Sequence, residues 1–94
     1  MAISFARLVL TYSAHRHGFG VEHVREVLRN RPLILRSRRG VKDGYDILGQ
    51  TFGGEYLEIV GRVVGLGETQ AFRVYHIARM HDRDRRRYQR WRRN

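Results

Sequence analysis

Cysteine is absent from the 94 residues, and proline occurs once. Without thiols the chain has no disulfide, no thiolate nucleophile and no cysteine-based zinc or iron–sulfur site. No apolar run is long enough to span a membrane, and residues 1–12 lack the basic region and cleavage site of a signal peptide. We therefore expect a cytoplasmic protein without membrane contact, in which any catalysis depends on histidine, carboxylate, tyrosine or arginine side chains.

Acidic residues are also scarce, with nine against nineteen basic residues and a net charge of +10. All of the basic residues except Lys42 are arginine. Such an excess attracts polyanions. At this length, with 41% hydrophobic residues, the chain fits a single folded domain over residues 1–94. The composition therefore predicts one nucleic-acid-binding domain.

The apolar spacing predicts an α+β fold. Apolar residues recur at helical spacing over residues 4–16 and 21–29, and Asn30 and Pro32 stop the second helix. Short apolar runs and alternation predict strands at 33–35, 45–51, 56–64 and 71–78, and a last helix from about residue 80 to residue 93. We expect two N-terminal helices, an antiparallel sheet of about four strands and a C-terminal helix.

Two candidate functional residues lie where the last strand meets the last helix. Strict alternation places Phe72, Val74 and His76 on one face of the strand and Ile77 on the other. His76 would then be half-buried, either as a structural histidine or as a proton-transfer group. Arg79 lies beside the start of a helix, where backbone N–H groups favour an anion.

The predicted C-terminal helix carries a run of arginines. Eight of the residues from Arg79 to Arg93 are arginine, interrupted by only two aspartates. Like charges on one helix repel each other and need a compensating partner, although a solvated surface is the alternative. Tyr88 and Trp91 are placed either to pack or to stack on bases.

Three histidines occur within nine residues near the N-terminus, at positions 15, 17 and 23. Their spacing does not face one ion on a helix, and no cysteine or clustered carboxylate completes a shell, so we expect neither a metal nor another cofactor. Arg16 is better suited to contact a phosphate, with His17 near an active face. The alternative is that these basic residues interact with the C-terminal dipole of a helix.

Two short motifs occur together in the chain. The first is His17-Gly18 before a short amphipathic helix, and the second is a late strand that continues into His76-x-Ala78-Arg79-x4-Asp84-Arg85-Arg86-x-Tyr88. With these motifs the chain, from Tyr12 to Arg90, resembles the BrnT-type toxins, which are similar to RelE-like ribonucleases.

The chain departs from the family pattern in four places. Arg16 stands where the family has lysine, His81 replaces a threonine at the helix start, and Asp84 replaces a glutamate. The strand that often opens the family is replaced by a segment with helical spacing. Because histidine does not cap a helix as threonine does, the start of the last helix is the least defined boundary.

The resemblance implies the toxin of a type II toxin–antitoxin pair. Such a protein is a metal-independent endoribonuclease that inhibits translation by cutting RNA. A cognate antitoxin covers its basic face, and the expected assembly is a homo-oligomer or a hetero-oligomer with the antitoxin. In that mechanism Arg79 and Arg86 stabilise the phosphorane, His76 or His17 exchanges protons, and Tyr88 orients the leaving group or stacks on a base. The expected RNA-binding residues are Arg16, Arg83, Arg87, Arg90 and Trp91.

Two other functions fit the same residues. A binding module without catalysis would hold RNA or DNA phosphates with its arginines and use His76 structurally. DNA recognition by a helix-turn-helix is a weaker version, because the helix over 21–29 is short and presents Glu22 and Glu26. Alternatively, the basic face binds an acidic protein partner, which does not exclude the ribonuclease.

Overall fold

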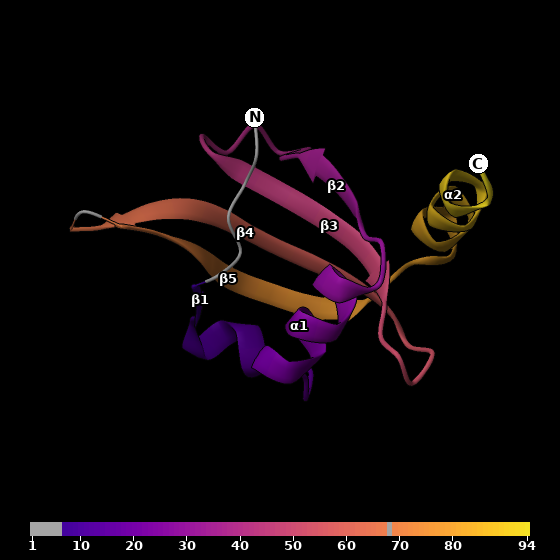
Figure 1. The fold of residues 1–94 in the computed structure, drawn as a ribbon, viewed down its shortest axis with the longest axis horizontal. Coiled ribbons are helices and arrows are strands. Elements are labelled where there is room, and N and C mark those ends of the chain that lie inside the picture. The colour runs from indigo at the N-terminus through magenta and orange to yellow at the C-terminus, as the bar shows by residue number, and fades with distance from the viewer. Residues whose placement is uncertain (1–6, 68) are drawn as a thin grey trace.

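The computed structural model describes residues 7–67 and 69–94. In order, the described elements are β1 (Leu8–Leu10), the 3₁₀ helix η1 (Tyr12–His15), α1 (Val21–Arg29), β2 (Leu33–Arg36), β3 (Gly44–Gln50), β4 (Tyr56–Leu66), β5 (Thr69–Arg79) and α2 (Asp82–Arg93). The strands form one sheet in the order β1-β5-β4-β3-β2 (Figure 1). The α+β class is confirmed, as is the antiparallel meander of β2 to β5.

The prediction of an N-terminal helix over residues 4–16 is wrong for the part of that segment that the structure describes. Leu8–Leu10 is instead a fifth strand, which lies parallel to β5 with Leu8 opposite Phe72. A short 3₁₀ helix follows it. Residues 4–6 of the predicted helix lie outside the described residues. Helical spacing reports only on near neighbours in the chain. Here three consecutive apolar residues adopt an extended conformation instead, because in that form their backbone can hydrogen-bond to the edge of β5.

The apolar core lies on one face of the sheet, beneath η1 and α1 (Figure 1). The buried cluster consists of Ala14, Phe19, Val24, Val27, Tyr45, Ile47, Leu57, Ile59, Phe72, Val74 and Ile77. Helix α1 begins where the backbone N–H of Gly20 donates to Nδ1 of His23, at 3.0 Å. A Cβ at Gly49 would lie 2.5 Å from Cγ1 of Val27, so this glycine lets α1 approach β3 closely.

A β-bulge interrupts the pairing of β4 with β5. Val60 lies opposite His76 and Gly61 lies opposite Val74, which leaves Tyr75 as the additional residue on β5. Val74 and Ile77 consequently both reach the core, where each is fully buried. His76 lies on the other face, so the prediction that it shares a face with Val74 is wrong. The period of two fails wherever a strand gains one residue.

Helix α2 packs at one end of the sheet, away from α1 (Figure 1). Tyr88 is its buried anchor, 1% exposed. The Tyr88 hydroxyl donates to the carbonyl oxygen of Arg31 at 3.1 Å, and Arg92 donates to that hydroxyl and to the carbonyl oxygen of Asn30. These bonds attach the last helix to the segment between α1 and β2. No described helix has the length and apolar character needed to cross a bilayer.

Candidate active site

The polar face of the sheet, opposite the core, carries the candidate site. Cross-strand neighbours point to the same side of a sheet. Asp46 lies opposite Val60, which in turn lies opposite His76, and Glu58 lies on the same face of β4 as Val60. The bulge therefore places His76 beside carboxylates instead of beneath α1.

A hollow of about 350 Å³ lies over His76, and we call it the histidine hollow. Its lining residues are Ser13, Arg16, His17, Arg39, Val60, Tyr75 and His76. The rings of His17 and His76 meet edge to face, with their centroids 5.7 Å apart. His17 precedes Gly18, whose φ of +85° suits glycine and turns the chain after η1. Two imidazoles and two guanidinium groups thus share one concavity.

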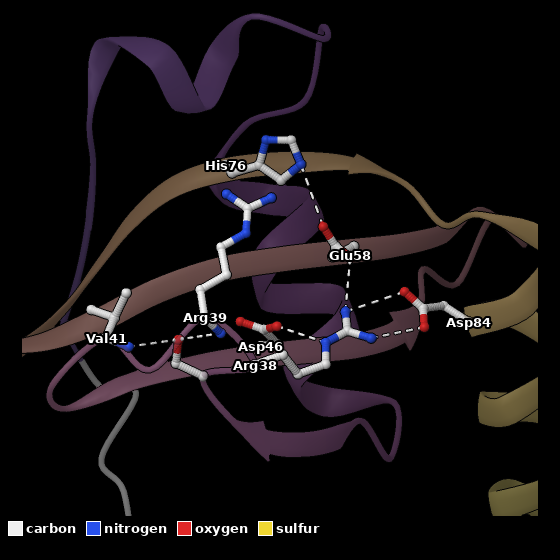
Figure 2. Close-up of polar contacts among 8 residues, drawn as sticks. Arg38, Arg39, Val41, Asp46, Glu58, His76 and Asp84 are labelled. Carbon is white, nitrogen blue, oxygen red and sulfur yellow. Dashed lines mark hydrogen bonds and ion pairs between the residues drawn. The ribbon is translucent and has the colours of Figure 1, made fainter.

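Local hydrogen bonds position the other members of the histidine hollow. Ser13 Oγ donates to the carbonyl oxygen of Tyr75, at 3.2 Å, and so joins η1 to the bulge. Ser37 Oγ accepts from the backbone N–H groups of Arg39 and Val41, at 3.3 and 3.1 Å, which tightens the loop between β2 and β3. From this loop the Arg39 side chain extends over the sheet toward His76 (Figure 2).

Arg38, the preceding residue of that loop, binds three carboxylates (Figure 2). Its Nε donates to Asp46 Oδ2 at 2.8 Å, and its Nη1 donates to Asp84 Oδ1 at 2.8 Å. Its Nη2 donates to Glu58 Oε2 at 3.0 Å, while Glu58 Oε1 lies 3.5 Å from Nε2 of His76. Glu58 is therefore shared between Arg38 and His76, and a carboxylate in this position orients an imidazole.

Charge compensation within this network is mutual. Hydrogen bonding by the Arg38 guanidinium holds the pKa of the Asp84 carboxyl below its usual range. The hydrogen bonds that Arg38 donates to Asp84 and Asp46 raise the pKa of its guanidinium group. The side chain of Asp46 is 8% exposed, and its ion pair with Arg38 is therefore largely shielded from water. The network fixes the loop, the sheet and α2 relative to one another.

Arg79 and Tyr88 lie away from the histidine hollow. Arg79 lies opposite Leu57, on the core side of β5, with its guanidinium carbon 5.7 Å from the centre of the Phe19 ring and its Nη2 3.3 Å from Glu55. Arg79 and His76, which the proposed mechanism had used together, lie on opposite faces of β5, because the strand alternates regularly from residue 76 to residue 79. Tyr88 is buried, and its hydroxyl is occupied in attaching α2.

A second concavity lies beside the first and has a volume of about 660 Å³; we call it the α2 hollow. Its lining residues are Arg38, His81, Arg83, Asp84, Arg87 and Arg90. Three of the predicted RNA-binding arginines thus come together at i, i+4 and i+7. Arg86 is exposed and does not line either hollow, and Trp91 is 38% exposed, with its ring centroid 5.9 Å from that of Tyr88.

Sequence reasoning missed Arg38, Arg39 and Glu58, and it had treated Tyr75 only as a strand residue. Arg38 and Arg39 fall in an arginine-rich loop that carries no periodic pattern. Glu58 is a polar residue between Leu57 and Ile59 in the strand predicted over 56–64, but its distance from His76 depends on the pairing of β4 with β5. That polar position was the only available signal.

The histidines at positions 15, 17 and 23 do not converge on one point: His17 lines the histidine hollow, whereas His23 accepts a hydrogen bond at the start of α1. Among the described residues, no group of three or more histidine, aspartate or glutamate side chains is arranged to hold a metal ion. No family model, curated protein or solved structure matches the chain. The functional argument therefore starts from the geometry of the two hollows.

Proposed function

We propose that this protein is a metal-independent endoribonuclease whose reaction takes place in the histidine hollow. The observation that carries the proposal is the edge-to-face pair of His17 and His76, 5.7 Å apart, in a concavity that Arg16 and Arg39 also line. In keeping with its two short motifs, we further propose that it is the toxin of a type II toxin–antitoxin pair that inhibits translation.

The reaction needs one proton acceptor and one proton donor. The 2′-hydroxyl attacks the adjacent phosphorus, the bond from phosphorus to the 5′-oxygen breaks, and the products are a 2′,3′-cyclic phosphate and a free 5′-hydroxyl. One imidazole takes the proton of the attacking hydroxyl, and the other gives a proton to the leaving oxygen. Positioned groups of this kind contribute roughly 10²- to 10⁴-fold to a rate.

Negative charge accumulates on the non-bridging oxygens as the phosphorane forms. Arg16 and Arg39 line the same hollow as both imidazoles, and guanidinium groups donate paired hydrogen bonds to phosphate oxygens. They take the role that the sequence had given to Arg79 and Arg86. Glu58, at 3.5 Å from Nε2 of His76, orients that ring without contacting the substrate.

RNA is the substrate that fits this chemistry, because the attacking group is a 2′-hydroxyl, which DNA lacks. The net charge of +10 supports the capture of a polyanion. An antitoxin with an acidic surface is the protein partner that would neutralise such a face, and it would block the histidine hollow when bound.

The test is cleavage of an end-labelled RNA in the presence of EDTA by the wild type, His76→Ala and His17→Ala. We expect each substitution to lower the cleavage rate by about 100-fold or more, and the wild type to leave 2′,3′-cyclic phosphate ends. His15→Ala is the matched control, since it removes an exposed imidazole of η1 that does not line the hollow. The control variant should cut RNA at the wild-type rate.

Full activity in His76→Ala would contradict the assignment of this residue. Tight, salt-sensitive RNA binding without any product would instead identify a non-catalytic binding module. Growth after expression of the wild type or of His76→Ala tests the toxin role separately. If the wild type does not slow growth, the toxin role is wrong, even where cleavage in vitro persists.

A further inference from the structure

We infer that the α2 hollow binds a second phosphate of the same RNA strand, one that is not cut. The inference rests on the proposed function, and it adds a substrate requirement. Cleavage in the histidine hollow would be efficient only for an oligonucleotide long enough to reach α2. The ligand of the α2 hollow is thus the phosphodiester backbone of single-stranded RNA.

Five of the seven arginines of α2 fall into two groups. Arg85 lies 3.6 Å from Asp82 and over the Tyr56 ring, and Arg92 is bound to Asn30 and Tyr88. These two residues stabilise the helix and its attachment. By contrast, Arg83, Arg87 and Arg90 line the α2 hollow, and none of them forms an ion pair within 4 Å among the described residues.

One carboxylate, Asp84, does line the α2 hollow, and both of its oxygens accept hydrogen bonds from Arg38, at 2.8 and 3.2 Å. Three arginines without an ion pair in the described part of the chain therefore line the concavity beside this single carboxylate, which Arg87 attracts at longer range. Gathering like charges in one place costs free energy unless an anion joins them, and three guanidinium groups suit the oxygens of a phosphate.

The two hollows are neighbours on one face of the protein. Arg38 lines the α2 hollow and Arg39, the next residue, lines the histidine hollow. Between them Glu58 contacts both Arg38 and His76, and Arg38 contacts Asp84 of α2 (Figure 2). An RNA strand bound at His76 would therefore cross only this ion-pair network before it reached α2.

The test compares two substrates, a dinucleoside monophosphate with a single phosphate and an octanucleotide with several. We expect Arg87→Ala to raise the KM of the octanucleotide about tenfold and to leave kcat/KM of the dinucleoside monophosphate unchanged. The log–log salt dependence of octanucleotide binding should fall by about 0.7, the value for one lost single-strand phosphate contact. Arg25→Ala is the control, because it removes the same charge from an exposed position of α1.

Equal effects of Arg87→Ala on both substrates, or no effect on either, would overturn the inference. A 2′-O-methyl octanucleotide, which cannot be cut, separates this inference from the proposed function. The wild type could fail to cut any RNA while Arg87→Ala, unlike Arg25→Ala, weakens binding of this probe. That result would contradict the ribonuclease proposal and support the phosphate site. If binding of the probe is unchanged while Arg87→Ala releases an acidic protein partner, the α2 hollow is a protein interface and the inference is wrong.

Discussion

The two faces of the sheet are built from the same strands and differ in almost every physical respect. On one face, η1 and α1 cover a continuous apolar cluster, which contains the fully buried Ile77. On the other face, the neighbouring residue His76 has a side chain that is 41% exposed and lies among ion pairs and arginines. The core face holds the continuous apolar cluster, whereas His76 on the polar face stays partly exposed, so the core and the proposed site can be perturbed separately.

Consecutive residues of β5 give the largest expected contrast between the two faces. Ile77→Ala should lower the free energy of unfolding by about 2–5 kcal/mol, because it removes buried methyl groups and leaves a cavity. His76→Ala should lower it by less than about 1 kcal/mol, because its one ion pair is partly exposed. Urea unfolding of both variants measures the difference. Comparable losses of stability would mean that His76 is a structural residue.

The importance of the β-bulge, which directs Val74 and His76 to opposite faces, can be tested at Gly61. A Cβ at this position would lie 2.5 Å from the carbonyl oxygen of Arg73 and 2.8 Å from the Phe72 ring. Gly61→Ala should therefore destabilise the protein by about 1–3 kcal/mol through overpacking. Gly65→Ala is the matched control on the same strand, since nothing lies within 4 Å of its added Cβ.

Thermal unfolding of the two glycine variants checks this expectation. A loss in Gly65→Ala as large as that in Gly61→Ala would show that glycine matters to β4 in general, and not to the close approach at the bulge. If Gly61→Ala is destabilised alone, its cleavage rate should also fall, because His76 lies next to the bulge.

The smallest expected effect concerns pH and the ion pairs of the polar face. The folded-state pKa of Asp84 lies below its usual range, so the ionised carboxylate stabilises the fold. That contribution is present above the pKa of the unfolded chain and is lost as the pH falls through the lower, folded-state value. Asp84→Asn should cost about 1 kcal/mol at pH 7, and the gap to the wild type should narrow below about pH 4.

Urea unfolding of the wild type and Asp84→Asn at pH 7 and pH 3 measures this narrowing. A gap that stays constant between the two pH values would mean that Arg38 stabilises residue 84 through hydrogen bonds independently of its charge. The core variant Ile77→Ala is the reference, because its loss of stability has no titrating group and should not change in this way.

Much of the fold could be predicted from local patterns. The helix at 21–29 was predicted with its observed bounds, and the strands of the meander lie where alternation and apolar runs placed them. In these segments the local periodicity agrees with the side that each element buries, and for this reason the elements could be predicted from the sequence. The prediction failed at residues 8–10, where the partner strand lies more than sixty residues away.

The candidate site was predictable only in its separate parts. Arg16, His17 and His76 were each singled out from the sequence, and the structure brings them into one hollow. Val74 was predicted to share a strand face with His76, but the additional residue in β5 turned the two side chains to opposite faces. A bulge forms between strands, and therefore no property of one strand alone announces it.

The amino-acid sequence by itself determined the positive charge, the helix and strand segments and the set of available chemical groups, because these depend on residue type and on near neighbours. Only the tertiary structure decided which groups meet. The pairing of His17 with His76, the three carboxylates around Arg38 and the sorting of the α2 arginines each depend on strand register and on the docking of α2. Contacts between distant segments are set by packing of the whole chain, which local spacing does not encode.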